Sequence, residues 1–534
     1  MTRIVIDPEA CVGCGDCNLI CPVSVFTVLP PPCQSVCPLN TDVHTYVSLI
    51  AQEKFDEALA SIEQVHPFPG IVGRVCTNPC EERCRRSDID EPIAIRALKR
   101  SAVEFGGNLN RGELPLPLAR KKEVAIIGSG PAGLMAAYDL AKLGYQVTMF
   151  ESLPVAGGML SVGIPEYRLP REIIKAEIAQ IENLGVEIKF NTTIGREKTL
   201  MMLIEQGYKA ILIATGAHGS LRLNIPGENV YNGVEHAISF LREVNLGGKR
   251  NFAGKAIVVG GGNAAIDSAR MLLRLGCDEV NVIYRRTRQE MPAIGSEVIE
   301  AEQEGVKIHY LVAPVRVLGQ DGKVVGVECI RTKPGNPDTN GQPTPMPVVG
   351  SEFYIDGNLV ILSIGQKPDL LFRHGCNDLA VSGDFVKVDP DTMATNLPGV
   401  FAAGDVANKP GTVIDALLAG RKAAVSIGRY LRKGDLKQEG EKEAKAGIME
   451  QERRWWREIP KRERGKEIEA PVEKRASNFN EVKAGLTKLS AVKEANRCLG
   501  CAIFAHIDVE SCCGESCRAC QYGCWKGAIT VTEK

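Results

Sequence analysis

The cysteines of this chain are concentrated at its two ends. Nineteen cysteines occur in 534 residues, and sixteen of them lie within residues 1–84 and 498–534. The opening residues lack the charged and then apolar pattern of a secretion signal, so we expect a cytoplasmic protein whose thiols stay reduced. Cysteines gathered in this way are typical of metal or cluster ligands, and we predict that role at both ends. The three between them, Cys277, Cys329 and Cys376, stand singly and are predicted to be small buried apolar residues.

Charge and hydropathy exclude two classes of function. The 64 basic and 65 acidic side chains give a formal net charge of -1, so no basic field is available to hold nucleic acid. The apolar runs, such as the one at residues 210–213, are far shorter than the ~18–20 residues needed to cross a bilayer. We therefore expect neither a nucleic-acid-binding protein nor a membrane-spanning one.

The first cysteine run has the spacing of a cluster-binding loop. Its members follow the pattern C-x2-C-x2-C-x3-C-P, in which thiolates on a tight loop bind three corners of a [4Fe–4S] cube. The fourth cysteine of such a run usually ligates a second cluster, so a second run is expected, and one occurs at the other end of the chain. The first run consists of Cys11, Cys14, Cys17 and Cys21. The second run consists of Cys512, Cys513, Cys517, Cys520 and Cys524.

Strand-like segments flank both runs, at residues 4–7, 25–28, 506–509 and 528–532. Each terminus is therefore predicted to form half of a bacterial-type ferredoxin, and we hypothesise that the halves fold together as one two-cluster module. One cube would be held by Cys11, Cys14, Cys17 and Cys524. The other would be held by Cys21, Cys517, Cys520 and either Cys512 or Cys513, of which we take Cys513. The alternative, that each end binds its own cluster or docks on a partner subunit, stays open.

The middle of the chain begins with a strand, a glycine-rich turn and a helix. The apolar run 124–127 suits a buried parallel strand, and Gly128, Gly130 and Gly133 follow it as G-x-G-x-x-G. These glycines allow a tight turn, close approach to a pyrophosphate and packing of the helix on the strand. Glu151 ends the next strand at the spacing where a carboxylate binds a ribose 2′-hydroxyl. This order of elements predicts a dinucleotide-binding domain and is hard to explain as an ordinary glycine-rich turn.

A second copy of this pattern occurs further along the chain. Gly260 and Gly262 occupy the first two glycine positions, and Ala265 takes the third, which the pattern permits. Its second strand ends in Arg285 and Arg286 in place of an acid, and such cations suit a 2′-phosphate. We therefore favour NADP(H) over NAD(H), while the alternative that these arginines contact only the pyrophosphate or solvent stays open.

Four further segments carry a family resemblance. Residues 157–168 read Gly-Gly-Met-Leu-Ser-Val-Gly-Ile-Pro-Glu-Tyr-Arg, 214–216 read Ala-Thr-Gly, 399–405 read Gly-Val-Phe-Ala-Ala-Gly-Asp, and 411–416 read Gly-Thr-Val-Ile-Asp-Ala. With the two glycine-rich motifs, they make the chain resemble the two-dinucleotide-binding flavoproteins. The closest resemblance is to glutamate synthase small subunits and their relatives. These relatives include the FAD/NADPH half of dihydropyrimidine dehydrogenase and the large subunit of NADH-dependent ferredoxin:NADP oxidoreductases.

The resemblance implies which residues bind the two nucleotides. FAD would be held by Gly128, Gly130, Gly133, Glu151, Gly158, Arg168, Gly404, Asp405 and Thr412. The nicotinamide nucleotide would be held by Gly260, Gly262, Asn263, Arg285 and Arg286. The disulfide reductases of this superfamily use a C-x-x-C pair near the flavin, and because the middle of this chain has none, that activity is not expected.

The remaining cysteines resemble the cluster domain of the same family. Residues 33–37 and 76–84 flank a helical stretch at 43–64. The family places a C-L-x-C pair before the first of these segments, whereas here the matching pair stands near the C-terminus. The resemblance thus implies one cube held by Cys33, Cys84, Cys498 and Cys501. It implies a second held by Cys37, Cys76, Cys80 and a non-cysteine ligand. Lys99 stands where the family has Gln or Glu, so that fourth ligand stays open, and zinc is the less favoured alternative for such cysteine pairs.

The predicted fold is α/β, with two nested Rossmann-like domains for FAD and NAD(P). A helical iron–sulfur domain precedes them, and ferredoxin-like α+β segments stand at both termini. Residues 434–497, rich in Lys, Arg and Glu, are predicted to form a charged linker that returns to the helical domain. The predicted boundaries are 1–30 for the first ferredoxin half, 31–115 for the helical domain, 116–249 with 361–433 for FAD, 250–360 for NAD(P)H, and 498–534 for the second half.

These features predict an FAD-dependent NAD(P)H oxidoreductase subunit with about four [4Fe–4S] clusters. Hydride transfer between nicotinamide and flavin needs ring stacking with reacting atoms ~3–3.5 Å apart and no protein acid or base, so no catalytic side chain is predicted. The chain has no recognisable second substrate site, so we expect electrons to pass to or from a partner redox subunit of an anaerobic multisubunit complex, or ferredoxin. Two alternatives stay open: an electron-conducting scaffold without its own nicotinamide turnover, and flavin-based electron bifurcation.

Overall fold

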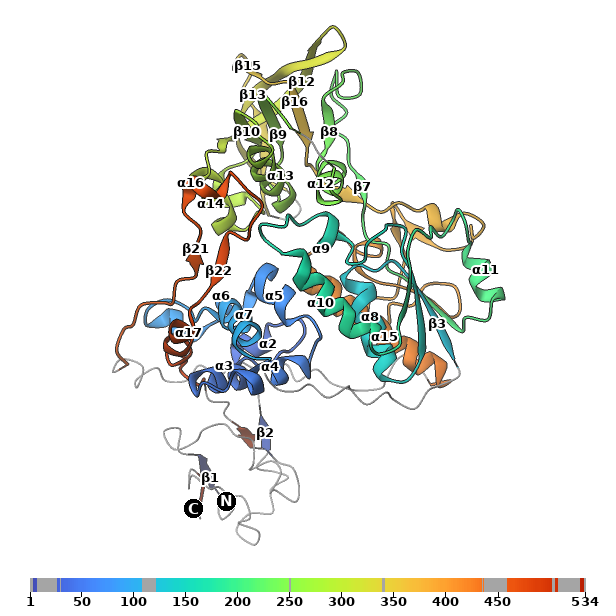
Figure 1. The fold of residues 1–534 in the computed structure, drawn as a ribbon, viewed down its shortest axis with the longest axis vertical. Coiled ribbons are helices and arrows are strands. Elements are labelled where there is room, and N and C mark those ends of the chain that lie inside the picture. Colours follow the sequence, from blue (N-terminus) through green and yellow to red (C-terminus); the bar gives the residue numbers. More distant parts are fainter. Residues whose placement is uncertain are drawn as a thin grey trace.

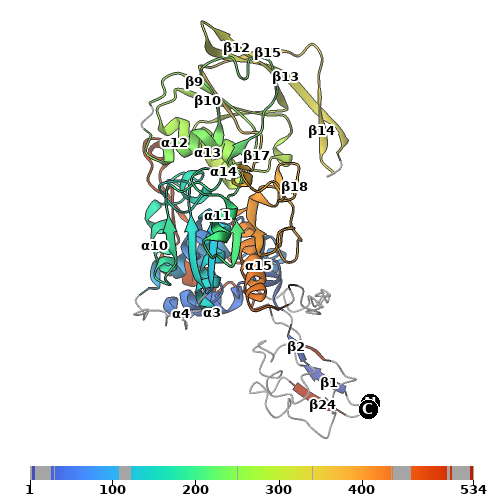
Figure 2. The same ribbon diagram turned by 90° about the vertical axis from the view of Figure 1, so that its right-hand side faces the viewer.

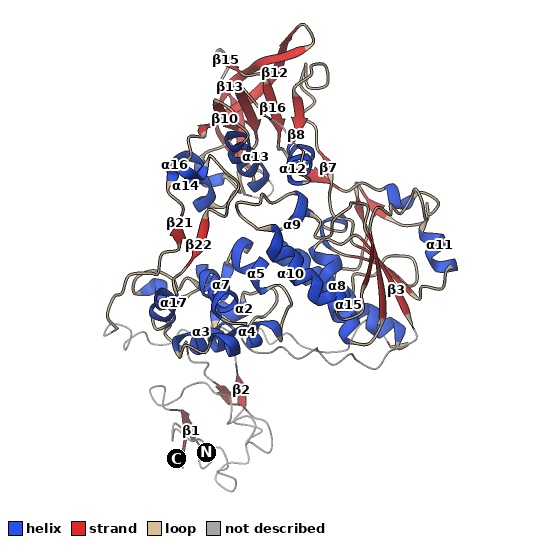
Figure 3. Cartoon of the chain, in the orientation of Figure 1, coloured by secondary structure: helices blue, strands red, loops and turns tan. Residues whose placement is uncertain are grey.

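The computed structural model describes residues 3–6, 26–28, 30–107, 122–248, 251–338, 341–434, 436, 459–501, 505–507 and 529–532. They form a helical domain, two domains built on parallel sheets, and a small module to which both termini contribute (Figure 1). Figure 3 shows the helical domain low in the view, with one parallel sheet above it and the other to its right, each accompanied by its own helices. Among these residues, no helix is both long and apolar enough to cross a membrane.

The first parallel sheet has the strand order β20-β6-β3-β4-β5. Its central strand β3 carries four consecutive buried residues, as expected for a parallel strand covered on both faces. Helices α8 and α15 pack on the sheet and along each other, and α10 packs on α8. The elements are β3 (Glu123–Ile127), α8 (Pro131–Lys142), β4 (Gln146–Phe150), α9 (Met159–Val162), α10 (Arg171–Glu182), β5 (Glu187–Lys189), α11 (Leu200–Glu205), β6 (Ala210–Ile213), β20 (Val400–Ala402) and α15 (Val413–Leu431).

The second parallel sheet has the order β11-β10-β9-β16-β8 and is inserted between β6 and β20. An antiparallel sheet of β12 to β15 lies against it. Strands β13 and β14 of this sheet extend to one side as a long hairpin (Figure 2). The elements are β8 (Val234–His236), α12 (Ala237–Asn245), β9 (Lys255–Val259), α13 (Asn263–Arg274), β10 (Glu279–Tyr284), α14 (Gly295–Gln303), β11 (Lys307–Tyr310), β12 (Val312–Gln320), β13 (Lys323–Pro337), β14 (Pro343–Pro347), β15 (Phe353–Asp356) and β16 (Leu359–Leu362).

The second domain is larger than the sequence predicts. The predicted range was 250–360, but β8 pairs with β16 inside the second sheet, so the domain takes in residues from 234 to 362. The crossing between the domains is a two-stranded ribbon in which β7 (Gly219–Ser220) pairs with β17 (Gln366–Lys367). Strand β8 is short and has no apolar run, so nothing in its sequence marks it as part of a sheet.

The helical domain packs around a core of aliphatic residues from its longer helices. The predicted helical stretch at 43–64 consists of two helices, and Glu53, with a positive φ of 61°, lies between them. Two very short helices, α2 and α6, each carry one cysteine of this domain, Cys33 and Cys80. The elements are α2 (Pro32–Ser35), α3 (Val43–Ala51), α4 (Phe55–Glu63), α5 (Pro69–Val75), α6 (Pro79–Glu82) and α7 (Ile95–Phe105).

The segment after α15 returns to the helical domain. Ala491 and Ala495 of α17 (Lys488–Ala495) are buried in the same core as α3 and α7. Before it, β21 (Ile468–Glu469), α16 (Val472–Arg475) and β22 (Lys483–Gly485) run from α14 down to α17 (Figure 1). Lys483 pairs with Glu300 of α14 at 2.5 Å, and Arg96 of α7 pairs with Glu467 at 3.5 Å. Residues 459–497 are therefore a packed strap, although the sequence predicts only a linker.

The two termini pair with each other. Strand β1 (Arg3–Ile6) runs antiparallel to β24 (Ile529–Thr532), and β2 (Phe26–Val28) runs antiparallel to β23 (Ala505–Ile507). The four strands lie within one or two residues of the predicted segments. Figures 1 and 2 both place them beyond the helical domain, with the N- and C-termini adjacent. We call this part the terminal module.

Candidate functional site

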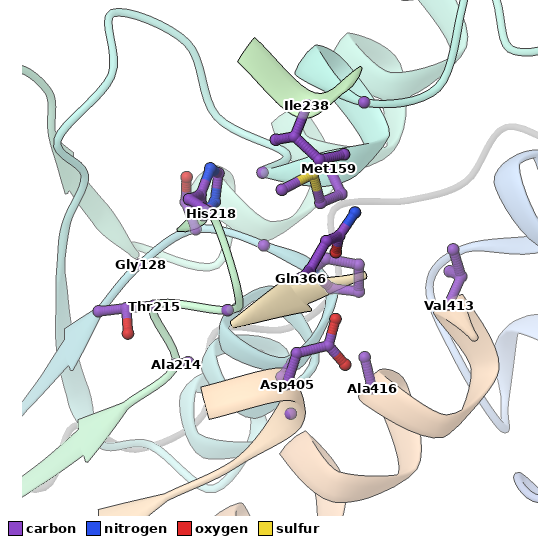
Figure 4. Close-up of a pocket in the computed structure, with 18 of the residues that line it drawn as sticks. Gly128, Met159, Ala214, Thr215, His218, Ile238, Gln366, Asp405, Val413 and Ala416 are labelled. Carbon is purple, nitrogen blue, oxygen red and sulfur yellow. The ribbon is translucent and has the colours of Figure 1, made fainter. Parts of the chain in front are cut away.

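A cavity of about 390 Å³ lies at the carboxyl ends of the strands of the first sheet. Ligands of open parallel sheets bind at this edge, where strand-end loops and helix N-termini converge. Its walls come from the turn after β3, the end of β4, the loop after β6 and the start of α15. Figure 4 shows Asp405 and Gln366 within this space, with Ala214 on one side and Val413 on the other. A cavity of this size falls within the range of small-molecule sites.

The cavity brings together eight of the nine residues that the resemblance assigns to FAD. They are Gly128, Gly130, Glu151, Gly158, Arg168, Gly404, Asp405 and Thr412. The ninth, Gly133, lies in α8 behind the turn, where a Cβ would come within 2.2 Å of the carbonyl oxygen of Gly128. Gly128 itself has φ +100°, and a Cβ there would lie 2.4 Å from the oxygen of Ala214. Both glycines are thus required by close backbone packing, as the motif predicts.

Glu151 is held at the end of β4 by four hydrogen bonds, one of them from the Ser152 hydroxyl at 3.3 Å. Its carboxylate accepts hydrogen bonds from the backbone N–H of Ser129 at 2.9 Å, from the Ser129 hydroxyl at 2.6 Å and from the N–H of Leu153 at 2.9 Å. The side chain is only 5% exposed. These contacts fix a carboxylate beside the glycine-rich turn, where a ribose hydroxyl could be bound.

The N-terminus of α15 forms part of the cavity wall opposite Glu151. Thr412 caps this helix, and its N–H and hydroxyl donate to Asp415 at 2.9 and 2.6 Å. Asp405 accepts a hydrogen bond from the N–H of Gly411 at 3.1 Å, and burial raises the pKa of Asp405 to about 6. A helix N-terminus carries partial positive charge and free N–H groups, so this wall suits a polar or anionic part of a ligand.

The same cavity extends to the second dinucleotide motif. Asn263, the first residue of α13, lines it, and its side-chain oxygen accepts from the N–H of Ile294 at 2.9 Å. Gly260, Gly262, Arg285 and Arg286 do not line the cavity. Gly260 nevertheless has the tight turn that the motif predicts, with φ +143° and a Cβ position 2.1 Å from the oxygen of Ser363. One cavity therefore reaches the starts of both α8 and α13.

Arg168 lines the cavity and also has two partners that the resemblance does not imply. Its guanidinium lies 2.8 Å from Asp267 and 3.3 Å from Glu297, both carboxylates of the second domain. These carboxylates raise its pKa even though burial lowers it. Arg168 therefore joins the two domains, and its contact with FAD stays a prediction.

The two arginines after β10 lie beside the hairpin of the antiparallel sheet. Arg286 donates from Nε to the carbonyl oxygen of Pro343 at 3.1 Å and pairs with Asp338 at 3.1 Å. Arg285 has an exposed side chain, and its carbonyl oxygen accepts from the Thr332 hydroxyl at 2.8 Å. The hairpin thus holds Arg286, whereas the exposed Arg285 lies at the strand end where the motif places a 2′-phosphate.

Sequence reasoning missed three residues that line the cavity. Burial lowers the pKa of His218, so its imidazole is neutral, and Figure 4 shows it on the side of Met159 and Ile238. Arg242 lies one turn after Ile238 on α12 and faces the same space. Asp267 of α13 is the partner of Arg168. His218 lies in the loop after β6, two residues beyond the Ala-Thr-Gly segment, whereas Arg242 and Asp267 reach the cavity only through the packing of the second domain on the first.

Four cysteines of the helical domain and the C-terminal segment line a second, small cavity. We call Cys33, Cys84, Cys498 and Cys501 the outer cysteine set. Cys33 lies in α2, Cys84 follows α6, and the other two follow α17. Burial, together with the neighbouring Cys498 and Cys84, raises the pKa of the Cys501 thiol to about 12. Four half-buried cysteines around one cavity fit a [4Fe–4S] cube, whose iron would stabilise the thiolate forms.

The other three cysteines form a neighbouring group, the inner cysteine set: Cys37, Cys76 and Cys80. The α2 region supplies Cys33 to the outer set and Cys37 to the inner set, and the α6 region supplies Cys84 and Cys80 in the same way. Cys37 donates from Sγ to the Thr41 hydroxyl at 3.5 Å. In the described part of the chain no three Cys, His, Asp or Glu side chains converge tightly enough to hold one metal ion. The fit of clusters therefore rests on the sulfur donors and the shared cavity.

The cysteines of the terminal module lie outside the described residues. They are Cys11, Cys14, Cys17, Cys21, Cys512, Cys513, Cys517, Cys520 and Cys524. The strands that flank both runs do pair across the termini, which favours one joint module over two separate halves. The three cysteines of the middle region are buried, as the sequence predicts.

Comparison with known proteins agrees with this architecture. The pyridine nucleotide-disulphide oxidoreductase model matches residues 122–420, the 4Fe–4S domain II of dihydropyrimidine dehydrogenase matches 26–109, and a 4Fe–4S binding domain matches 4–27. The chain also shares the fold of Mycobacterium tuberculosis FprA in complex with NADPH. That likeness has a TM-score of 0.51 and 19% identity, and covers 59% of this chain and 85% of FprA.

Three relatives show the wider similarity. The NADP(+)-dependent formate dehydrogenase subunit beta of Moorella thermoacetica is 44% identical over 502 residues, covering 88% of this chain and 70% of that protein. The NADPH-Fe(3+) oxidoreductase subunit beta of Geobacter sulfurreducens is 39% identical, covering 88% and 75%. The glutamate synthase [NADPH] small chain of Escherichia coli is 31% identical, covering 79% and 90%.

The matched domains confirm the predicted fold, the oxidoreductase class, and the cofactor classes of FAD, nicotinamide nucleotide and [4Fe–4S] clusters. The chain therefore belongs to the pyridine nucleotide-disulphide oxidoreductase family, in the group of glutamate synthase small chains and their iron–sulfur relatives.

Proposed function

We propose that this chain is the NADP(H)- and FAD-binding subunit of a multisubunit electron-transfer complex. In this proposal electrons pass between the flavin, the inner cysteine set, the outer cysteine set and the terminal module. A partner redox subunit or ferredoxin then exchanges electrons with that module. Three relatives are named as a subunit beta or a small chain, which supports a partner subunit.

One observation carries the proposed order of carriers. Val75 and Thr77 both line the large cavity, and Cys76 stands between them in the chain. A cluster on the inner cysteine set would therefore adjoin the flavin directly. Because the two cysteine sets share the short segments around α2 and α6, a cluster on the outer set would come next.

Chain connectivity brings the terminal module close to the outer set. Cys33 follows β2 by five residues, and Cys501 precedes β23 by four. A fully extended chain spans at most about 3.6 Å per residue, so these connections reach no further than about 18 Å and about 14 Å. Two short tethers at the same pair of cysteines support the terminal module as the last carrier before the partner.

The residues around the large cavity have a binding and orienting role. FAD, when bound, supplies the conversion between two-electron hydride chemistry and single-electron transfer. Glu151 and the N-terminus of α15 provide polar contacts at two opposite walls, and the apolar side chains of Met159 and Ile238 exclude water between them. The neutral His218 and the cationic Arg242 lie on the side that faces the second domain, where a nicotinamide nucleotide would enter.

The NADP(H) preference rests on the exposed arginine after β10. The exposed side chain of Arg285 would contact the 2′-phosphate, with Arg286 held beside it by the hairpin. The relatives named above as NADP- or NADPH-dependent support the same choice. A planar guanidinium binds a phosphate with two donors, which the hydroxyl of NADH would leave unused.

The test uses the full chain, purified without oxygen and loaded with FAD and iron. NADPH should bleach the flavin and then reduce the clusters, as followed by visible absorbance and EPR, and NADH should do so more slowly. Absence of flavin reduction by either nucleotide would overturn the proposal.

Two matched variants test the order of carriers. In C76S the flavin should still bleach with NADPH while the remaining clusters stay oxidised, because the first carrier is lost. In C498S the inner cluster should still be reduced, because the break lies beyond it. Rapid reduction of every remaining cluster in C76S would refute the proposed order.

A further inference from the structure

Lys99 is a buried cation beside the inner cysteine set. It lies in α7 and is only 7% exposed. Two contacts fix α7 on either side of it. The N–H of Arg96 donates to Glu81, the residue after Cys80, at 2.9 Å. The backbone of Arg100 packs on α5 so closely that a Cβ on Gly73 would lie 3.0 Å from the Arg100 Cα. Lys99 therefore lies between the segments that carry Cys80 and Cys76.

Among the described residues, the Lys99 side chain forms no hydrogen bond and no ion pair. No carboxylate in that part of the chain therefore neutralises its ammonium group. The buried acids nearby are already engaged. Glu81 accepts from Arg96 and pairs with Arg464, and Glu494 accepts from the N–H of Ala94 at 2.8 Å and pairs with Arg497 at 2.7 Å. Burying an unpaired charge is costly, so Lys99 needs an anion that the polypeptide alone does not provide.

The inner cysteines are the nearest source of negative charge. Burial raises the pKa of Cys76 and of Cys80, and the charge of Lys99 is the largest influence that opposes burial at both thiols. The outer set has four sulfurs around its cavity, whereas the inner set has three and a lysine. The two sets therefore differ by one thiolate and one positive charge.

We infer that a cluster on the inner set is bound by three protein thiolates, with the ammonium of Lys99 as its counter-ion beside the fourth iron. This inference rests on the proposed function, because it assumes that the inner set carries a cluster. Reduction adds one electron and one negative charge to such a cluster and breaks no iron–sulfur bond. A fixed cation beside it stabilises the reduced form, so Lys99 favours electron transfer from the adjacent flavin to this carrier.

The test is an EPR-monitored redox titration of the full chain, loaded with FAD and iron and reduced with dithionite. In K99M the one-electron equilibrium of the inner cluster should shift at least tenfold toward the oxidised form, which lowers its midpoint by 59 mV. In K99R the midpoint should stay close to wild type, because arginine keeps the charge. Iron content and flavin content should be unchanged in both variants, which also shows that they fold.

The same variants separate a counter-ion from a ligand. Arginine cannot ligate iron as a neutral amine, so loss of iron from both K99R and K99M would show that Lys99 is the fourth ligand and would overturn the inference. K99C offers a fourth thiolate, and it should abolish the three-iron EPR signal that mild oxidation produces in the wild type. Absence of that signal in the wild type would also count against three-thiolate binding.

His66 is the rival ligand. It is fully buried, its Nδ1 accepts from the N–H of Phe68 at 3.3 Å, and its Nε2 has no hydrogen-bond partner among the described residues. We expect H66A to keep the wild-type iron content and EPR spectrum, and loss of one iron in H66A would overturn the inference.

The two proposals can fail separately, because dithionite reduces the clusters without the nicotinamide nucleotide. If K99M shows the expected midpoint shift but NADPH does not bleach the flavin, the proposed function alone is refuted. Normal bleaching without a shift in K99M would refute this inference alone.

Discussion

The large cavity and the outer cysteine set are built in opposite ways. The cavity is made from strand ends and glycine turns, and its first wall comes from residues close together in the sequence, such as Gly128 and Glu151. The outer set joins Cys33 and Cys84 to Cys498 and Cys501, from opposite ends of the chain. The backbone therefore determines the geometry of the nucleotide site locally, whereas the cluster site depends on a long-range closure.

That closure is made by a group of buried charges. Arg497 is 2% exposed at its side chain, and it pairs with Asp90 at 2.7 Å and with Glu494 at 2.7 Å. It also donates to the carbonyl oxygen of Glu91 at 2.7 Å. Arg86 donates to the carbonyl oxygen of Arg497 at 3.3 Å, which ties the C-terminal segment to the α6–α7 connection. The residue just before Cys498 thus holds the outer set together.

The largest effect is expected from R497A. The substitution leaves Glu494 without its cation, while Asp90 keeps its pair with Arg86, and breaking a buried pair such as that of Glu494 costs about 3–5 kcal/mol. The outer cluster should be lost, as measured by iron content, while FAD binding and flavin bleaching by NADPH persist. K493A, an exposed change on the same helix, is the control and should keep all its iron. Loss of flavin from R497A would mean that the two sites are not independent.

A smaller effect, on the other site, is expected from G128A. Its φ of +100° is strained for alanine, and the new Cβ would meet the oxygen of Ala214 at 2.4 Å. Left-handed strain and overpacking together cost about 2–4 kcal/mol, so FAD content should fall sharply while the iron of the helical domain is retained. Gly207 has a similar φ of +103° with nothing within 4 Å, so G207A isolates the backbone strain. Equal loss of FAD from both variants would show that the close approach to Ala214 does not matter.

The same contrast explains what could be predicted from the sequence. The strand, turn and helix at Gly128 were predicted because a local motif contains its own geometry. The division of cysteines into outer and inner sets came from the family resemblance, and the structure groups the outer four around one cavity. The ion pairs of Arg168, the position of Arg242 and the role of β8 could not be predicted, because each exists only where one domain packs on another. The strap at 459–497 was underestimated for the same reason, since its charges look solvated until their partners are known.

The flavin domain meets the inner cysteine set at Glu177, where the smallest effect is expected. This carboxylate of α10 lies beneath the N-terminus of α5 and accepts from the N–H groups of Gly70 at 2.5 Å and Ile71 at 3.1 Å. Burial raises its pKa to about 8, although both hydrogen bonds and Arg74 lower it. Helix α5 leads directly into Cys76. The protonation of Glu177 therefore affects the junction between the flavin domain and the inner cysteine set.

The direction of the pH effect follows from that raised pKa. Between about pH 4.5 and 8 the folded protein binds the Glu177 proton more tightly than the unfolded chain, so stability falls as pH rises. The full change is about 1.4 kcal/mol per pH unit within this window. E177Q mimics the neutral carboxyl group. The free energy of unfolding, measured in urea, should therefore change between pH 6 and pH 7.5 by about 2 kcal/mol less in E177Q than in the wild type. E172Q, an exposed change at the start of α10, is the control and should keep the wild-type pH dependence. If E177Q retains that dependence as well, Glu177 is ionised throughout this range, and the coupling between the two regions is not sensitive to pH.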